Sequence, residues 1–257
     1  MGKVILVTGA SRGIGKSIVE AILNTSDDAV VYGVARSEAP LKEIKQRYGD
    51  RFFYVVGDVT DGVVLKTLVD DAVKGHGKID SVVANAGVIE PIQNVNNIVV
   101  DQWKKLFDIN FFSGVSLVGI ALSYLKETHG NIVFVSSDAS DTYFDCLGAY
   151  GSSKAALNHF AMTVAKDEKS VKAISVAPGI VDTQMQGVLR DNTAMPDEAL
   201  RSFANLKSES KLDDCSVSAT VYAKLVLNGI PDQLNGKYVS YNDESLKTSR
   251  LEPKFIR

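Results

Sequence analysis

Short runs of apolar residues recur along the 257-residue chain, and within them apolar and polar positions do not alternate. Strands that are buried on both faces have this pattern, which is typical of a parallel sheet covered by helices on both sides. Seven runs predict strands, and they lie at 4–7, 29–32, 52–56, 81–84, 132–135, 173–177 and 237–241.

The segments between these runs have helical patterns and are long enough for the crossovers that parallel strands require. The predicted helices lie at 14–23, 38–48, 63–74, 102–126 and 150–166. Strands alternating with helices in this way predict a single doubly wound α/β domain, with a central, mostly parallel seven-stranded sheet flanked by helices.

Two regions depart from this pattern. Residues 179–211 have weak periodicity and mix apolar residues with charges. Both surface helices and a substrate lid at about 184–211 are open interpretations, and the position after a strand favours the lid. The domain is expected over 1–244, and the polar segment 245–257 is expected to be a loosely held tail.

Composition narrows the class of protein. Hydrophobic residues make up 45% of the chain and the net charge is -3, which favours neither a nucleic-acid partner nor a membrane surface. No apolar run approaches the roughly 20 residues that span a bilayer, and no signal-peptide pattern is present. Two cysteines and three histidines share no metal-binding spacing. We therefore expect a cytoplasmic protein without a metal site.

A glycine-rich segment, Thr8-Gly-Ala-Ser-Arg-Gly-Ile-Gly15, lies between the first predicted strand and an amphipathic helix. In this context backbone amides and the positive end of the helix bind a dinucleotide pyrophosphate. The first glycine allows the tight turn, the second lets the backbone approach the pyrophosphate, and the third lets helix and strand pack closely. The predicted cofactor contacts here are Gly9, Ser11, Arg12, Gly13, Ile14 and Gly15.

The ends of the second and third predicted strands bear on the choice of cofactor. A carboxylate after the second strand would bind the ribose hydroxyls of NAD, but Ala35 and Arg36 stand there. Arg36 and Arg12 together suit a 2′-phosphate, although Arg36 as a solvated loop charge is the alternative. Asp58, which precedes Val59, either accepts from the adenine amino group or caps the next helix. NADP(H) is the predicted cofactor.

Tyr150 and Lys154 are four residues apart and share one face of a predicted helix. A nearby ammonium is expected to lower the pKa of the phenol from its ordinary value of about 10. Ser137 follows the fifth predicted strand, where its hydroxyl is placed to hold a carbonyl oxygen, whereas the competing Ser136 is expected to point the opposite way. With the glycine-rich segment, these residues predict hydride transfer to or from a carbonyl.

In these motifs the chain resembles the short-chain dehydrogenase/reductases, which have a Rossmann fold, over essentially its full length. The resemblance implies a catalytic tetrad of Asn110, Ser137, Tyr150 and Lys154. Asn110 is expected to hold a proton-relay water, with bracing of its own helix as the alternative. Tyr150 and Lys154 also count as cofactor contacts, and further contacts implied by the family motifs are Asn85, Ala86, Gly87, Pro178, Gly179, Val181 and Thr183.

The resemblance also implies assembly. The helices that contain Asn110 and Tyr150 pair across the two-fold dimer of the family, so a homodimer or homotetramer is expected. Small or flat residues expected to allow close packing there are Ala155, Ala156, Phe160 and Ala161.

A narrower resemblance is to sepiapterin reductase and to carbonyl reductases, including fungal ones, that reduce benzil. Ala35-Arg36-Ser37, Phe111-Phe112 and segment 236–243 carry it, but Ser240 stands where sepiapterin reductase has its pterin-binding aspartate. NADPH-dependent reduction of an aromatic or alkyl α-diketone is therefore the favoured function. A non-catalytic NADPH-binding scaffold protein and a pterin reductase are the alternatives. Predicted substrate contacts are Ser137, Tyr143, Phe144, Leu147, Tyr150, Met185 and Leu189.

Overall fold

The computed structural model describes residues 2–190, 192, 195–208 and 212–247. Within them, seven strands form one sheet in the order β3-β2-β1-β4-β5-β6-β7, and every neighbouring pair is parallel. The predicted doubly wound α/β fold is confirmed. The strands are β1 (Val4–Thr8), β2 (Val30–Ala35), β3 (Phe52–Val56), β4 (Ser81–Ala84), β5 (Asn131–Val135), β6 (Lys172–Ala177) and β7 (Tyr238–Ser240).

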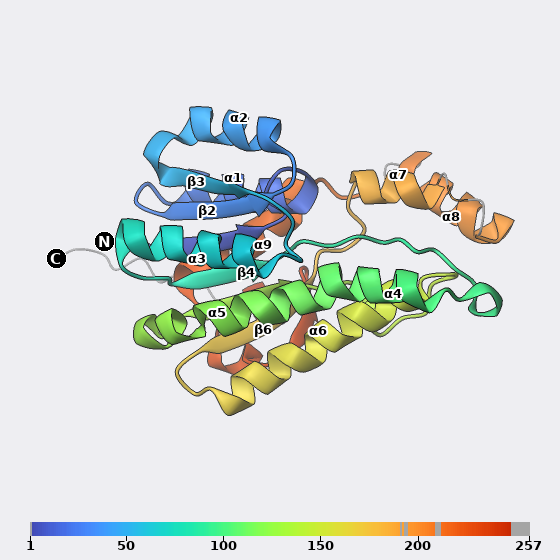
Figure 1. Ribbon diagram of the computed structural model, residues 1–257. Helices are drawn as coiled ribbons and strands as arrows, with labels where there is room; N and C mark the ends of the chain where they lie inside the picture. The colour runs from blue at the N-terminus through green and yellow to red at the C-terminus, as the bar shows by residue number, and fades with distance from the viewer. Residues whose placement is uncertain (1, 191, 193–194, 209–211, 248–257) are drawn as a thin grey trace.

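Helices cover both faces of the sheet (Figure 1). In β1, Ile5 and Val7 belong to the apolar core on one face, whereas Val4 and Leu6 belong to the core on the other. Both faces of the strand are buried, and its one polar residue, Thr8, lies at its carboxyl end. One face packs against α1 (Gly13–Thr25), α2 (Glu38–Tyr48) and α9 (Cys215–Asn228), and the other against α3 (Gly62–His76), α5 (Ser113–Thr128) and α6 (Gly148–Asp167).

The predicted helix at 102–126 is longer and is interrupted. It consists of α4 (Val100–Phe107) and α5, joined by a π-helical turn at Asp108–Phe112. The N–H of Ser113 donates to the carbonyl oxygen of Asp108, five residues earlier. Such turns frequently occur at functional sites, and this one contains the buried Asn110. Apolar spacing did not indicate the turn because the pattern on either side stays helical.

The same segment, Val100–Thr128, is long and apolar enough to cross a membrane by length and composition alone. The sequence had predicted no segment that could span a membrane. In this fold, Leu117, Ala121 and Leu125 of α5 belong to the core beneath the sheet. The segment therefore serves as a core helix along α5.

Residues 179–211 form two helices, α7 (Gln184–Arg190) and α8 (Asp197–Ser208), beyond one end of the sheet (Figure 1). Leu189 and Met195 are buried in a small apolar cluster that also contains Tyr150 and Leu147. The segment is thus helical and packs over the predicted catalytic tyrosine. Its role as a lid stays a prediction, and its last residues, 209–211, lie outside the described residues.

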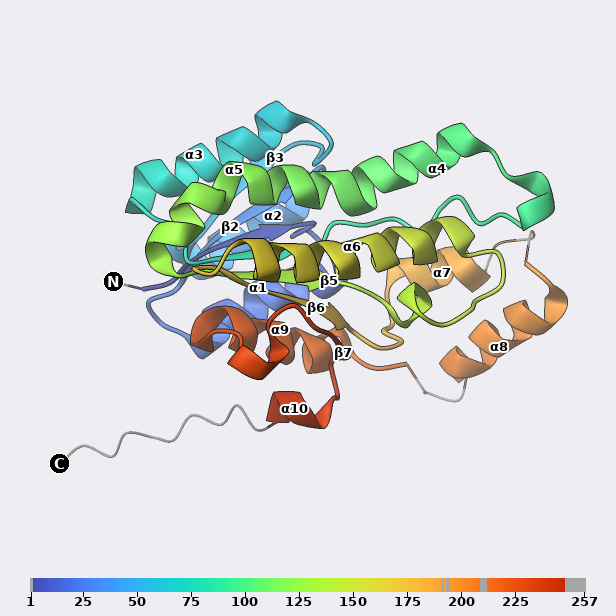
Figure 2. The ribbon, with the colours of Figure 1, turned by 90° about the horizontal axis from the view of Figure 1, so that it is seen from below.

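The beginning of the predicted tail is helical. After β7 the chain forms α10 (Glu244–Lys247), which lies near α9 and β7 (Figure 2). Leu246 packs against the core on that face of the sheet. The expected boundary at residue 245 is therefore placed too early, and residues 248–257 lie outside the described part of the chain.

Candidate active site

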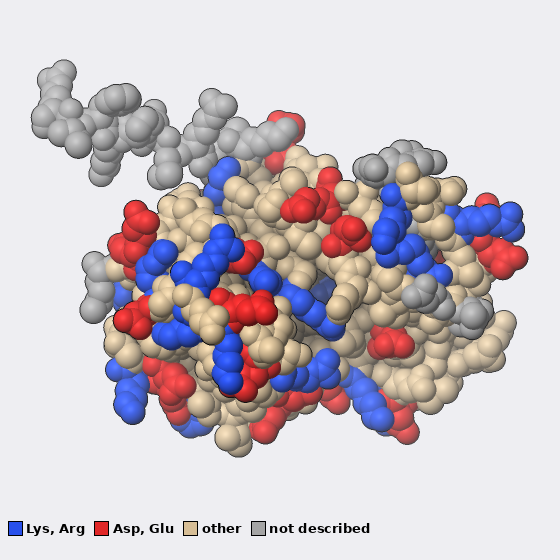
Figure 3. All heavy atoms as spheres, turned by 90° about the horizontal axis from the view of Figure 1, so that it is seen from above, with Lys and Arg blue, Asp and Glu red and all other residues tan. Residues whose placement is uncertain are grey.

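A cavity of about 890 Å³ lies along the carboxyl edge of the sheet. Figure 3 shows a hollow near the middle of one face, with basic side chains at its border. The cavity is lined by most of the predicted cofactor contacts, namely Gly9, Ser11, Arg12, Gly13, Ile14, Gly15, Ala35, Arg36, Asp58, Val59, Asn85, Ala86, Gly87, Tyr150, Lys154, Pro178 and Thr183. Thus residues distant in sequence meet where ligands bind in doubly wound folds.

Two predicted contacts, Gly179 and Val181, do not line the cavity. Gly179 has a φ of +78°, and a Cβ there would lie 2.6 Å from the ring of Tyr241. Val181 is buried and forms a bridge with Asp213. These two residues brace the loop that carries Thr183 rather than face the cavity.

Conformation and close packing require glycine in the loop after β1. Gly9 and Gly13 have φ values of +68° and +52°. A Cβ on Gly15 would lie 2.2 Å from the carbonyl oxygen of Gly9 and 2.4 Å from Nδ2 of Asn85. At Gly13 the nearest atom would be a methyl of Thr183 at 3.6 Å, so backbone conformation, not space, is the constraint there.

Asn85 joins the loops that follow β1 and β4. Its Nδ2 donates to the carbonyl oxygens of Thr8 at 2.7 Å and Gly9 at 3.3 Å. In return, Oγ1 of Thr8 accepts from the backbone N–H groups of Asn85 at 2.9 Å and Ala86 at 3.0 Å. These four hydrogen bonds hold the ends of the neighbouring strands β1 and β4 together. Thr8 is a partner that the sequence reasoning missed, although it begins the glycine-rich motif.

The adenosine end of the cavity contains Arg36 and Asp58. Oδ1 of Asp58 accepts from the backbone N–H and the hydroxyl of Thr60, both at 2.9 Å. These bonds, with a smaller contribution from Arg36, lower the pKa of Asp58 below its ordinary value. Asp61 caps α3 by accepting from the N–H of Val63. Of the two roles left open for Asp58, capping of α3 is therefore wrong, and contact with the adenine amino group stays a prediction.

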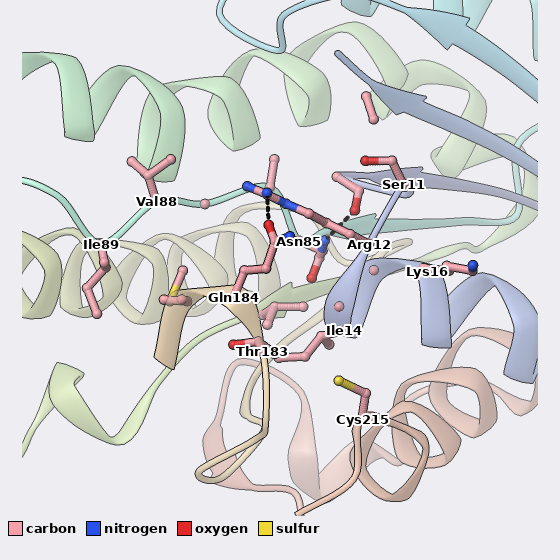
Figure 4. Close-up of a pocket in the computed structure, with 18 of the residues that line it drawn as sticks. Ser11, Arg12, Ile14, Lys16, Asn85, Val88, Ile89, Thr183, Gln184 and Cys215 are labelled. Atoms are coloured by element: carbon pink, nitrogen blue, oxygen red, sulfur yellow. Dashed lines mark hydrogen bonds between the residues drawn. The ribbon is translucent and has the colours of Figure 1, made fainter. Parts of the chain in front are cut away.

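Arg12 extends across the cavity to the start of α7 (Figure 4), where its guanidinium donates to Oε1 of Gln184. Gln184 was not predicted, because its partner lies 172 positions away in the chain. Cys215, which begins α9, also lines the cavity without any local sequence signal. Among the described residues, neither Arg12 nor Arg36 forms an ion pair with a carboxylate.

Tyr150, Lys154 and Ser137 come together at the end of β5. Nζ of Lys154 donates to the carbonyl oxygen of Val135 at 2.8 Å and lies 5.7 Å from the centre of the Tyr150 ring. The hydroxyl of Ser137 forms a hydrogen bond with that of Tyr150 and accepts from the N–H of Ala139. Ser136 borders the cavity, but its hydroxyl donates to Asn158 at 2.6 Å. The two serines thus have different hydrogen-bond partners, and Ser136, not Ser137, is among the residues that line the cavity. The opposite orientation of the two hydroxyls stays a prediction.

The pKa of Tyr150 differs from the prediction. Burial raises it above the ordinary phenol value, the bond with Ser137 acts in the opposite direction, and the charge of Asp138 raises it further. Burial also lowers the pKa of Lys154 to about 8. The expectation that the ammonium lowers the tyrosine pKa is therefore wrong, because desolvation is the largest contribution and raises the pKa.

Asn110 is held tightly within the protein. Its Oδ1 accepts from the N–H of Val88, and its Nδ2 donates to the carbonyl oxygen of Val88, both at 2.8 Å. Nδ2 also donates to the hydroxyl of Ser153 at 3.1 Å. Both donors of the amide are thus used, and they connect Asn110 to Val88 and to Ser153 of α6 rather than to its own helix. Participation of Asn110 in a proton relay stays a prediction.

The predicted substrate contacts are only partly brought together. Met185 lines the cavity, and Phe144, Leu147 and Leu189 lie in the apolar cluster around Tyr150. Tyr143 is 81% exposed, and its hydroxyl donates to Asp145. Its predicted place in an apolar wall is therefore wrong, because an exposed partner holds the ring outside the cluster. Lining residues that were not predicted at this end are Val88, Ile89, Glu90 and Val188.

Comparison with known proteins identifies the class. Residues 3–194 match the family model for short chain dehydrogenases. The chain belongs to this family of oxidoreductases, whose members use nicotinamide cofactors.

Several yeast proteins are similar over nearly the whole chain. An uncharacterized oxidoreductase of Saccharomyces cerevisiae, YIR035C, is 68% identical over 96% of this chain and 98% of its own length. Its crystal structure gives a TM-score of 0.95 and covers 96% of this chain and 99% of that one. A benzil reductase of the same yeast that forms (S)-benzoin is 50% identical over 96% and 98% of the two chains. A solved S. cerevisiae structure described as a cytoplasmic protein of unknown function is 67% identical, with a TM-score of 0.84 over 96% and 99%.

Proposed function

We propose that the protein is an NADPH-dependent carbonyl reductase that acts on aromatic or alkyl α-diketones. The observation that carries the proposal is the placement of Tyr150, with Ser137 and Lys154 beside it, in the cavity that the glycine-rich loop of β1 also lines. A scaffold protein would not need a buried phenol and a buried ammonium at this position, since burying an ammonium is costly.

The residues present fit a nicotinamide dinucleotide with a 2′-phosphate. The cavity has the volume of a ligand site, and a Cβ on Gly15 would push α1 away from the loop beneath it. Arg36 follows β2 with no carboxylate at the strand end, and Arg12 also lines the cavity. We infer that these two guanidinium groups bind the 2′-phosphate, with Arg12 exchanging its bond to Gln184.

In the proposed reaction, Tyr150 donates its phenolic proton to the carbonyl oxygen of the substrate. Since burial raises its pKa, the proton is retained at neutral pH until negative charge develops on that oxygen. The Ser137 hydroxyl donates a hydrogen bond to the same oxygen, and Lys154 binds the nicotinamide ribose. When bound, NADPH supplies the hydride that reduces the carbonyl carbon. Holding the reacting groups in register accounts for much of such catalysis.

The substrate class follows from the surroundings of Tyr150. Val88, Ile89, Met185 and Val188 line this end of the cavity, so flat and weakly polar molecules suit it. A relative at 50% identity is a benzil reductase, which supports an α-diketone. A pterin has several polar groups, and each one buried without a partner costs about 1–3 kcal/mol. Ser240, which stands where sepiapterin reductase has its pterin-binding aspartate, is not among the residues that line the cavity.

The test is NADPH oxidation by the purified protein with benzil, diacetyl and sepiapterin, and with NADH in place of NADPH. We expect a higher kcat/KM for the diketones than for sepiapterin, and for NADPH than for NADH. Arg36→Asp should weaken NADPH binding about tenfold or more and favour NADH, since charged hydrogen bonds contribute roughly 1.5–3 kcal/mol. Equal use of both cofactors would contradict the cofactor assignment, and a preference for sepiapterin would contradict the substrate class.

We also propose a cytoplasmic location. The yeast protein described as cytoplasmic supports it, as does the lack of disulfide bonds among the described residues.

A further inference from the structure

The end of the cavity near Tyr150 is lined by fewer basic residues than the end that holds the glycine-rich loop, which also contains the carboxylates Glu20 and Asp58. Figure 4 shows Val88 and Ile89 at the opposite end of the cavity from Lys16. Next to Ile89 lies Glu90, an exposed residue that also lines the cavity. The basic lining residues Arg12, Lys16 and Arg36 come from the loop after β1, the first turn of α1 and the end of β2.

A second carboxylate, Asp138, directly follows the catalytic Ser137. The phenol of Tyr238 on β7 lies 3.1 Å from the carbonyl oxygen of Ser137 and 3.4 Å from Oδ1 of Asp138. This contact holds the carboxylate beside the serine instead of leaving it to turn into solvent. Its charge also acts on the reacting hydroxyl, because it contributes to the raised pKa of Tyr150.

We infer that Glu90 and Asp138 make the enzyme select neutral carbonyl compounds and reject those that carry a carboxylate, such as 2-oxo acids. The inference rests on the proposed reductase function and names its substrate class more narrowly. An anionic substrate would bring a third negative charge to a site partly shielded from water, where repulsion between like charges is stronger than in bulk solvent.

The buried ammonium of Lys154 also lines the cavity and offsets part of this negative charge. It donates to the carbonyl oxygen of Val135, a neutral partner that leaves its charge in place. Arg190 is on the nearby helix α7, but it is not among the residues that line the cavity. Of the described lining residues, Glu90, Asp182 and Asp214 are exposed carboxylates.

The experiment compares benzoylformate with methyl benzoylformate, which present the same aryl ketone with and without a negative charge. The quantity measured is the ratio of kcat/KM for the acid to that for the ester. Intrinsic reactivity differs between the two compounds, but it cancels when variants are compared with wild type. The variants are Glu90→Gln, Glu90→Lys and Asp138→Asn. Asp70→Asn, an exposed position on α3, is the control with the same change in net charge.

We expect Glu90→Gln and Asp138→Asn each to raise the acid-to-ester ratio about three- to tenfold, and Glu90→Lys to raise it further. Added salt should reduce these differences, and Asp70→Asn should keep the wild-type ratio. Glu90 is exposed, so its variants keep the test valid even if Asp138→Asn fails to fold. Wild-type ratios in the Glu90 variants and in any folded Asp138→Asn would overturn the inference while leaving the reductase function intact. If neither methyl benzoylformate nor benzil causes NADPH loss, the proposed function itself fails.

Discussion

The reactive side chains at this site are buried, which disfavours their charged forms. Lys154 and Tyr150 are both buried, and in each case burial shifts the pKa away from the charged form. The sequence predicts the pair and its helical spacing, but the direction of the pKa shift depends on how much water the fold removes. That quantity arises from packing by distant segments and is not visible in Tyr-x3-Lys.

Replacing Tyr150 with phenylalanine removes the proton donor and keeps the ring. We expect kcat for diketone reduction to fall about 10²–10⁴-fold, the range for loss of a general acid. NADPH affinity, measured by fluorescence titration, should stay within a few-fold of wild type, because the glycine-rich loop and the arginines are unchanged. Ser136→Ala is the matched control, since its hydroxyl is directed to Asn158. A Tyr150→Phe protein with most of the wild-type turnover would contradict the mechanism.

Replacing Lys154 with methionine should stabilise the fold while abolishing activity. A pKa lowered from 10.5 to about 8 corresponds to roughly 3 kcal/mol of destabilisation from the buried charge. Loss of the hydrogen bond to the Val135 carbonyl destabilises the variant by about 1 kcal/mol. At pH 7 the variant should therefore be about 2 kcal/mol more stable in urea unfolding.

The pH dependence supplies the control for this prediction. The unfolded chain binds more protons than the folded one between pH 8 and 10.5, so wild-type stability from this group rises with pH across that window. The advantage of Lys154→Met should thus be largest below pH 8 and shrink toward pH 10.5. A constant advantage would show that packing, not charge, is its cause.

At the scale of elements, the approach of α1 to the end of β1 determines the cofactor site. A Cβ on Gly15 would contact the Gly9 carbonyl and the Asn85 amide at under 2.5 Å, and neither group is the end of a flexible chain. Gly15→Ala should therefore displace α1, lower stability by about 1–3 kcal/mol and weaken NADPH binding at least tenfold. Thermal unfolding and titration with NADPH measure the two effects.

Gly62→Ala is the matched control for Gly15→Ala. Gly62 begins α3, and nothing lies within 4 Å of a Cβ built there. This substitution should leave both stability and cofactor affinity nearly unchanged or raise stability slightly. Equal effects of the two substitutions would mean that the close approach of α1 to the end of β1 at Gly15 does not determine stability or cofactor binding.

The elements themselves were largely predictable, because every strand is an apolar run and helix α2 matches its predicted range of 38–48. What could not be predicted depends on contacts between distant segments. The π-helical turn at Asn110 adds a residue without disturbing the apolar pattern on either side. Gln184 joins the site only because α7 lies across the cavity from Arg12. Tyr143 is adjacent to the apolar cluster in sequence but turns outward to Asp145.

At the scale of the whole molecule, the π-helical turn and helix α6 each leave an apolar side chain uncovered by the fold. Phe112 is 51% exposed and Met162 is 41% exposed, on the π-helical turn and on α6. Phe112 also borders a second hollow with Trp103 and Phe107 of α4. Of the residues predicted to pack closely in a dimer, Ala161 is fully buried within its own chain, so the expected patch needs correction. Exposed apolar patches mark interaction sites, and the surface around these two side chains is the candidate.

We predict a homodimer or homotetramer that uses this surface, because a symmetric interface covers the same patch on both chains. Light scattering at micromolar protein should give at least twice the 27.7 kDa of one chain. Phe112→Asp combined with Met162→Asp should shift the mass toward 27.7 kDa, since an aspartate buried at an interface without a partner is strongly disfavoured. The control is Val63→Asp, which places the same charge at a 73% exposed position on α3 and should leave the mass unchanged. A wild-type protein that scatters as a single chain would contradict the assembly, and a double variant that stays oligomeric would show that another face holds it together.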